Sequence, residues 1–250
     1  MTGFGARRRD SWLTREWAGV QLWAILAMAV LLVAIGGVWF AHAAKGSGAT
    51  AAASASPTGG PPEALFLGDS YTLGTGASDE AHRWSTLVSE DQGWVELNYG
   101  RVGAGYSTAD DCKGDSCFGL AEAIGEAVDA GVEPDIVIIS GGLFDRDHWL
   151  ADSEAVTAAV DATYAELRDQ FPRTPILAVG PYFPWGPLDW KFDFDDAVEA
   201  AADSIDADYV SLLRPKAVKF KQNNFGDALH VNDDGHQLIA KRVIEAVESR

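Results

Sequence analysis

Two short stretches of the sequence carry residues that could act together as a hydrolytic site. Gly68-Asp69-Ser70 follows an apolar run, and near the C-terminus Asp227 precedes His230 by three residues. A serine hydroxyl becomes a strong nucleophile when an imidazole takes its proton and a carboxylate holds the imidazole in the right tautomer. A spacing of three residues lets one short turn present Asp227 and His230 on the same side. The sequence therefore allows a Ser-His-Asp triad.

Both stretches also have a purely structural interpretation. Gly, Asp and Ser are common turn residues, so Gly68-Asp69-Ser70 could be a plain strand-to-helix turn. The C-terminal stretch could be a helix-entry loop in which Asn232 or Asp233 caps the last helix. Other parts of the chain must decide between these interpretations.

The elements that would position these residues follow from an alternation of β-like and amphipathic segments after residue 63. We expect strands at residues 64–69, 95–100, 135–142, 175–182 and 208–213, and helices at 84–92, 118–131, 153–171, 193–206 and 233–248. Such alternation predicts an α/β fold with three layers, α/β/α, around a five-stranded parallel sheet of the flavodoxin-like type. In this architecture the chemistry gathers at the carboxyl ends of the strands, where Ser70 lies.

The two stretches together resemble the SGNH (GDSL-type) hydrolase family. The sequence "GDS" follows the first predicted strand, and "DALHVNDDGH" precedes the last predicted helix. The resemblance covers residues 64 to about 247. It implies that Ser70 is the nucleophile, that His230 is the general base, and that Asp227 orients His230.

The family's glycine-rich second block is matched by "NYGRVGAG" at residues 98–105. This match implies that the backbone N–H groups of Gly103 and Ser70 hold the oxyanion. The third block, Gly142-Leu143-Phe144-Asp145 at the end of the third predicted strand, departs from the family pattern. Phe144 stands where an oxyanion-binding Asn is expected, and a phenyl ring donates no hydrogen bond. Losing one such donor costs about 10²–10³ in rate. Asp145 is retained, and we expect it to cap the loop or to form a salt bridge there.

A substrate pocket is predicted near the strand ends and includes Phe144, Asp145 and Trp185. The aromatic stretch "PYFPWGPLDWKFDF" at residues 181–194 could stack on sugar rings, hold an acyl chain, or be a packed lid without a ligand. The sequence contains no metal-ligand cluster, phosphate-binding loop or dinucleotide fingerprint, so no cofactor or metal is expected.

The N-terminal part reads as a membrane anchor. Residues 17–40 contain no charged residue, and 24 helical residues span about 36 Å, enough to cross a bilayer. Four arginines precede this segment and only Lys45 follows it closely, which places residues 1–16 in the cytoplasm and the large domain outside. The alternative is a signal peptide cleaved near Ala43, which would release a secreted protein.

Composition sets further limits on the exported part. Residues 41–63 are rich in Ala, Gly, Ser and Pro and form a linker to the hydrolase-like domain at 64–250. The chain carries a formal net charge of −18, and a surface this acidic repels nucleic acid. Cys112 and Cys117 are the only cysteines, and outside the cytoplasm we expect them to form a disulfide.

The sequence thus predicts a membrane-anchored, extracytoplasmic serine ester hydrolase. Its expected partners are the membrane and an ester-bearing small molecule, glycan or lipid of the cell envelope. Two alternatives stay open: an acyltransferase that uses the same site, and a non-catalytic envelope-binding module on a degenerate hydrolase fold.

Overall fold

The computed structural model describes residues 16–17, 20–21, 59–107, 118–184 and 189–250. They belong to two units, residues 1–51 and 52–250, which we treat separately. In the first unit, β1 (Glu16–Trp17) pairs antiparallel with β2 (Val20–Gln21). The predicted helix therefore does not begin at Trp17, because Trp17, Val20 and Gln21 lie in strands. The remainder of the predicted anchor lies outside the described residues, and no helix among those described is long and apolar enough for a membrane span.

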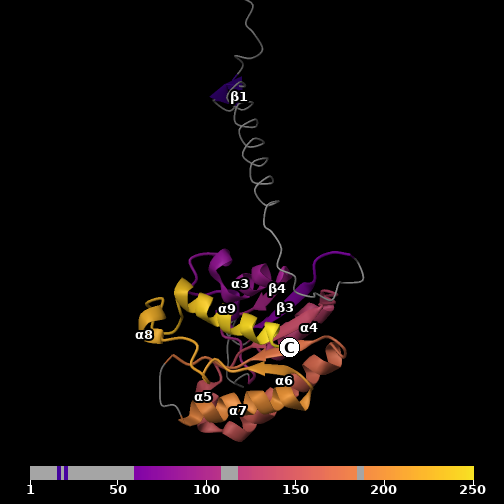
Figure 1. Ribbon diagram of the computed structural model, residues 1–250, viewed down its shortest axis with the longest axis vertical. Helices are drawn as coiled ribbons and strands as arrows, with labels where there is room; N and C mark the ends of the chain where they lie inside the picture. Colours follow the sequence, from indigo (N-terminus) through magenta and orange to yellow (C-terminus); the bar gives the residue numbers. More distant parts are fainter. Residues whose placement is uncertain (1–15, 18–19, 22–58, 108–117, 185–188) are drawn as a thin grey trace, which may run out of the picture. The chain divides into compact units, whose positions relative to one another are not determined.

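The second unit is built on a five-stranded parallel sheet, as predicted (Figure 1). Its strands lie in the order β4-β3-β5-β6-β7. Their bounds are β3 (Glu63–Gly68), β4 (Val95–Gly100), β5 (Ile136–Ser140), β6 (Ile176–Val179) and β7 (Asp208–Val210). The central strands are almost wholly buried because helices cover both faces of the sheet.

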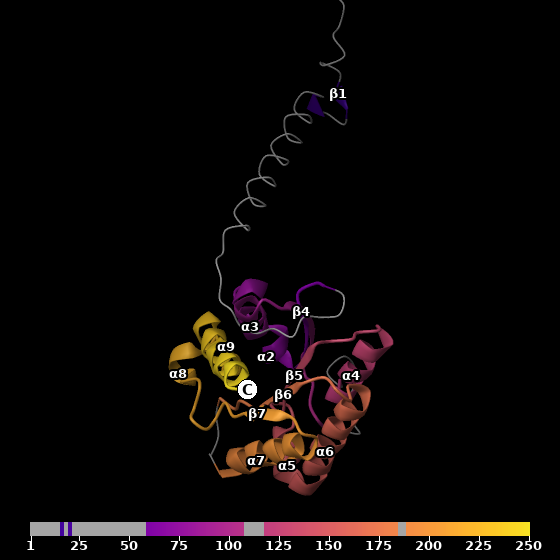
Figure 2. The ribbon, with the colours of Figure 1, turned by 45° about the vertical axis from the view of Figure 1, so that its right-hand side comes forward.

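The sheet lies between two helical layers (Figure 2). α3 and α9 pack together on one face, and α4, α5, α6 and α7 cover the other. The helices are α2 (Ser70–Leu73), α3 (Trp84–Gln92), α4 (Leu120–Asp129), α5 (Arg146–Ala151), α6 (Ser153–Gln170), α7 (Asp189–Ser204), α8 (Phe220–Asn223) and α9 (Asp233–Glu248), with a 3-10 turn at Glu80–His82. All five predicted helices are present, and the short helices α2, α5 and α8 are additional.

Side-chain caps determine where the two longest predicted helices, α6 and α9, begin. The Asp152 carboxylate accepts a hydrogen bond from the N–H of Ala155 at 3.0 Å and begins α6. The Asn232 side chain accepts one from the N–H of Gly235 at 3.1 Å and begins α9. Each cap satisfies a backbone donor that would otherwise have no partner in the first turn.

The strand register brings three loops to one edge of the sheet. Gly68, the last residue of β3, pairs with Gly100 on one side and Ser140 on the other. The strands are parallel, so the loops after β3, β4 and β5 all leave the sheet at this edge. Ser70 and the second and third sequence blocks are therefore neighbours.

Candidate active site

The nucleophile candidate lies in a tight turn between β3 and α2. Asp69 precedes the helix, and its Oδ1 accepts a hydrogen bond from the N–H of Tyr71 at 2.9 Å. A side chain at Gly68 would collide with Thr72 and with the carbonyl oxygen of Ser140. Glycine is therefore required where the turn packs between α2 and β5, and the turn holds Ser70 in a fully buried position.

The structure brings Ser70, His230 and Asp227 together in that order. His230 Nε2 lies 2.9 Å from Ser70 Oγ, and His230 Nδ1 lies 2.5 Å from Asp227 Oδ2. The other carboxylate oxygen of Asp227 accepts hydrogen bonds from the N–H groups of Leu229 at 2.9 Å and His230 at 2.8 Å. The three-residue spacing thus forms a turn that aims both side chains of the pair.

The charge of Asp227 determines which ring nitrogen of His230 carries the proton. Partial burial raises its pKa, but hydrogen bonds from the His230 ring and from the N–H groups of His230 and Leu229 outweigh this and lower the pKa to about 2. Asp227 is therefore ionised at neutral pH and selects the tautomer with the proton on His230 Nδ1. Nε2 is left free to accept the proton of Ser70.

Tyr71, the residue after the nucleophile candidate, ties the two halves of the site together. Its hydroxyl donates a hydrogen bond to the carbonyl of Leu229 at 2.5 Å, and its ring lies 5.6 Å from that of His230. The ring of the buried His236 lies 6.4 Å from that of Tyr71, and its Nε2 contacts the carbonyl of Thr75 at 3.3 Å. These contacts hold the His230 loop against α2, and His236 serves this packing.

The second block packs directly against the nucleophile turn. The N–H of Arg101 donates to the carbonyl of Gly68 at 2.9 Å, and the Asn98 amide donates to the carbonyl of Thr72 at 2.8 Å. Gly103 follows two residues later with φ at +84°, a conformation that favours glycine. Its oxyanion role stays a prediction of the sequence.

The third-block residues lie differently from the predicted pocket. Asp145 is fully buried, and its carboxylate accepts hydrogen bonds from the N–H of Tyr106 at 3.0 Å and from the N–H and hydroxyl of Ser107, both at 2.7 Å. It therefore neither lines an open pocket nor forms the expected cap or salt bridge, because its oxygens bind the loop after β4. Phe144 is 37 % exposed, and Trp185 lies outside the described residues.

Comparison with known proteins decides the family. The family model described as GDSL-like Lipase/Acylhydrolase matches residues 66–238. The chain belongs to the GDSL-like lipase/acylhydrolase family. The sequence resemblance is thereby confirmed, and it supports an ester hydrolase.

Solved structures share the fold of this GDSL-like chain at low sequence identity. Est24, a carbohydrate acetylesterase from Sinorhizobium meliloti, matches with a TM-score of 0.61 and 14 % identity over 75 % of this chain and 99 % of its own. The M. smegmatis aryl esterase gives the same four values. A two-domain esterase, CEX, active on acetylated mannans, has a TM-score of 0.55 and 18 % identity over 76 % of this chain and 49 % of its own. A comparison with curated proteins found no significant match.

Sequence reasoning missed the state of Asp69, the acid of the GDS motif. Complete burial raises its pKa to about 7, against the lowering effect of hydrogen bonds from the N–H groups of Tyr71 and Leu143. The charge of nearby Asp145 raises it further. The motif shows that an acid is present, but its burial depends on packing against the third-block loop, which local sequence does not reveal.

The pKa of Asp69 predicts a specific pH dependence of stability. Its folded-state pKa lies above the unfolded value near 4, so its contribution to stability is complete below about pH 4 and is lost as the pH rises through 7. Between pH 5 and pH 8 this loss amounts to about 2–3 kcal/mol. We expect Asp69→Asn to remove that part of the pH dependence.

Urea denaturation at both pH values measures the effect. The difference in free energy of unfolding between wild type and Asp69→Asn should change by this amount from pH 5 to pH 8, in favour of the variant at pH 8. Asp161→Asn, at an exposed position of α6, serves as the control. An unchanged difference would show that Asp69 is ionised throughout.

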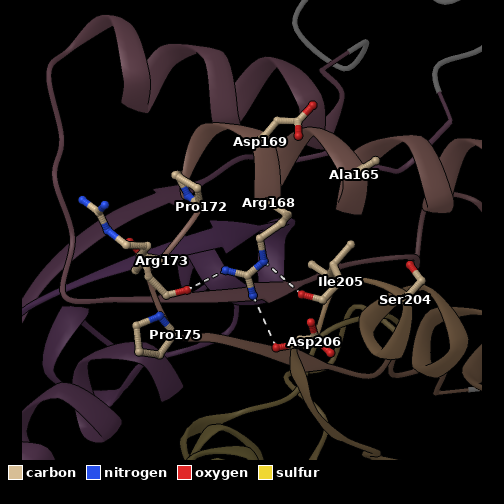
Figure 3. Close-up of a pocket in the computed structure, with 10 residues that line it drawn as sticks. Ala165, Arg168, Asp169, Pro172, Arg173, Pro175, Ser204, Ile205 and Asp206 are labelled. Carbon is tan, nitrogen blue, oxygen red and sulfur yellow. Dashed lines mark hydrogen bonds between the residues drawn. The ribbon is translucent and has the colours of Figure 1, made fainter.

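One hollow of the described surface lies away from the triad (Figure 3). It has a volume of about 580 Å³ and lies at the amino ends of the strands, next to Pro175, which precedes β6. Its central Arg168 donates hydrogen bonds to the carbonyls of Thr174, Ile205 and Asp206 at 2.9, 2.9 and 3.3 Å. The arginine thus holds these loops together.

Within the described ranges no group of three or more His, Cys, Asp or Glu side chains could hold a metal ion.

Proposed function

We propose that this chain is a serine esterase that removes small acyl groups, acetyl above all, from glycans of the cell envelope. The observation that carries this proposal is the continuous hydrogen-bonded series from Ser70 through His230 to Asp227, with distances of 2.9 and 2.5 Å. The family supports ester hydrolysis. The carbohydrate acetylesterase and the esterase active on acetylated mannans support an acetylated sugar as substrate.

The reaction follows from this geometry in two stages. Ser70 Oγ attacks the ester carbonyl while its proton passes to His230 Nε2, and the resulting imidazolium is stabilised by ionised Asp227. The tetrahedral intermediate then collapses, and His230 returns the proton to the leaving alcohol. Water next attacks the acyl-enzyme with His230 again as base, which releases the acid and restores Ser70. We assign the oxyanion to the N–H groups of Ser70 and Gly103.

Substrate access requires local movement. Ser70 is wholly inaccessible and His230 is 7 % exposed, so an ester reaches the hydroxyl only when a neighbouring side chain gives way. A small acyl group needs the least displacement. This restriction favours acetyl over long acyl chains.

Location is the second part of the proposal. We place the membrane anchor in the apolar segment that follows Gln21 and runs to residue 40, which lies outside the described residues; the basic segment at 1–16 would then be cytoplasmic, and the linker at 41–63 would carry the domain at 64–250 outside. The basic residues before the apolar segment support this orientation. In that compartment Cys112 and Cys117, which lie outside the described residues, form a disulfide.

Hydrolysis of a series of 4-nitrophenyl esters by the full-length protein tests the activity. We expect the acetyl ester to give the highest kcat/KM and the octanoyl ester to be at least tenfold poorer. Adding a sugar acceptor and analysing the products distinguishes free acetate, which supports the esterase, from an acylated sugar, which supports the acyltransferase alternative. If no ester is cleaved, the non-catalytic envelope-binding module is the better explanation.

Phe144 provides a gain-of-function prediction. If only two backbone groups hold the oxyanion, Phe144→Asn supplies a third donor and raises kcat by up to about 10²–10³. Misplacement of the new amide by about 1 Å would reduce this gain in kcat about 10²-fold. The partly exposed Phe144 ring leaves little cavity when it is replaced.

The control for this gain is Phe144→Leu, which removes the ring without adding a donor. Measurement of kcat and KM on an acetyl and a longer ester distinguishes an oxyanion effect, which acts on kcat for both, from a pocket effect, which acts on KM for the longer one. A lower kcat on both esters in folded Phe144→Asn would contradict the missing-donor explanation.

A further inference from the structure

One strongly exposed aromatic ring lies in the loop that carries the candidate base. Of the aromatic side chains described in residues 59–250, only Phe144 and Phe225 are exposed, and Phe225 is the more exposed of the two at 56 %. Phe225 belongs to the loop between α8 and α9, two residues before Asp227. A single exposed apolar residue is normal on a protein surface, so its surroundings must show whether it has a role.

Backbone pairing places Phe225 directly opposite His230. Asn224 and Val231 form an antiparallel bridge, and the N–H of Phe225 donates a hydrogen bond to the carbonyl of His230 at 2.9 Å. Residues directly opposite each other in an antiparallel pair have Cβ atoms about 5 Å apart and extend to the same face. The Phe225 ring is therefore a neighbour of the His230 imidazole, whose Nε2 lies 2.9 Å from Ser70 Oγ.

Other neighbours of His230 belong to the interior of the site. The Tyr71 ring lies 5.6 Å from the imidazole, and a side chain at Gly76 would come within 3.2 Å of the His230 Cβ. His230 and Tyr71 are both buried. Phe225 thus gives the buried imidazole a neighbour that faces solvent, and this ring is accessible before any movement uncovers Ser70.

The chemistry of the reaction identifies which part of an ester lies beside His230. In the proposed reaction His230 returns the proton to the leaving alcohol, so the alcohol oxygen must come within hydrogen-bonding distance of Nε2. The carbonyl oxygen of the ester faces the oxyanion donors instead. The alcohol part of the substrate therefore extends past His230, and a ring beside His230 contacts that part.

An exposed phenyl face suits a sugar as the alcohol. A pyranose ring presents C–H groups that carry a small positive charge, and the face of an aromatic ring is negative. Three amide residues, Gln222, Asn223 and Asn224, directly precede Phe225, and Gln222 and Asn224 are exposed. Amides both donate and accept hydrogen bonds, as sugar hydroxyls do. The segment 222–225 therefore combines an aromatic face with polar groups that match the rest of a sugar.

We propose that Phe225 determines specificity by stacking on the pyranose ring of the leaving alcohol, so that this esterase prefers acetylated sugars over acetates of acyclic alcohols. The inference rests on the proposed function, which supplies the ester bond and the acetyl group. It assigns recognition of the sugar to a residue outside the triad and outside the oxyanion donors. The aromatic face holds the sugar where His230 can protonate the leaving oxygen.

Two matched acetates test the preference in the full-length protein. Methyl 6-O-acetyl-α-D-mannopyranoside and 1-O-acetylglycerol are both primary acetates with free hydroxyl groups, but only the mannoside contains a sugar ring. We expect wild type to give the higher kcat/KM for the mannoside. In Phe225→Ala the ratio of mannoside to glycerol kcat/KM should fall about tenfold, the scale of one stacking contact removed by alanine substitution. The fall should appear mainly in KM, because the ring contacts no reacting atom.

Further variants separate stacking from other effects of position 225. Phe225→Trp keeps an aromatic face and should preserve the ratio, whereas Phe225→Leu keeps an apolar side chain without that face and should lower it. Val95→Ala, which removes an exposed apolar side chain at the amino end of β4 and thus at the opposite edge of the sheet, should leave it unchanged. An unchanged ratio in Phe225→Ala would contradict the proposal. An equal fall in kcat on both acetates would also contradict it, because the ring would then only hold His230 in place.

A binding measurement separates this inference from the proposed function. In Ser70→Ala, NMR titration should show tighter binding of the acetylated mannoside than of 1-O-acetylglycerol, and adding Phe225→Ala should remove the difference. Binding of the mannoside through Phe225 without hydrolysis by wild type would overturn the esterase but support the sugar contact. Hydrolysis of both acetates with no preference for the mannoside in either assay would support the esterase and overturn the sugar contact.

Discussion

Replacing Ser70 with alanine is expected to lower kcat for an acetyl ester by about 10⁶-fold, because the attacking oxygen is removed. His230→Ala should cause a similar loss, since Ser70 Oγ then has no base within hydrogen-bonding distance. The double variant should be no slower than either single variant, because the two side chains act as one unit. Steady-state rates of hydrolysis measure all three.

The control for this loss is Ser89→Ala, which removes another buried serine hydroxyl, located in α3 and without a hydrogen-bond partner among the described residues. It should retain wild-type turnover. Circular dichroism should show that Ser70→Ala and His230→Ala are folded, because both positions lie on loops or at a helix start at the sheet edge. Near-normal turnover in either folded variant would show that the triad is wrongly assigned.

Asp227→Asn is expected to lower kcat by about 10⁴-fold while leaving the fold intact. Asp227 is ionised because its pKa lies at about 2, and its charge selects the Nδ1–H tautomer of His230. An asparagine amide can donate its own N–H to Nδ1, which moves the ring proton to Nε2. His230 then no longer accepts the proton of Ser70.

Asp234→Asn is the control for this effect, because it removes an exposed carboxylate from the same stretch of chain. The pH dependence of the free energy of unfolding provides a further check on the lowered pKa of Asp227. The pKa of Asp227 is lower in the folded protein, so its contribution to stability is present above about pH 4 and is lost as the pH falls through about 2. A loss of activity below tenfold in Asp227→Asn would indicate that another group orients His230.

The sequence predicted the sheet and the proximity of Ser70, His230 and Asp227 because both depend on strong local signals. Each apolar run is bounded by turn residues, and "GDS" and "DALH" lie directly at a strand end and before a helix. The residues at which the strands end were less predictable. β7 ends at Val210 because the Ser211 hydroxyl accepts hydrogen bonds from the N–H groups of Leu213 and Arg214, which turns the chain. The prediction had extended this strand to residue 213.

Contacts between distant segments account for what the sequence did not reveal. Asp145 binds Tyr106 and Ser107, nearly 40 residues earlier, so its structural use is invisible in its own loop. Such pairings depend on the closed fold, and local patterns carry no record of them.

The most direct test of the proposed esterase is covalent labelling by a fluorophosphonate, which reacts with a serine only when a neighbouring base activates it. Tandem mass spectrometry of the digested full-length protein should find a single adduct, on Ser70, and the adduct should be absent in His230→Ala. Loss of esterase activity should follow labelling in proportion. A protein that hydrolyses esters but carries the label on a different serine, or carries none, would contradict the account.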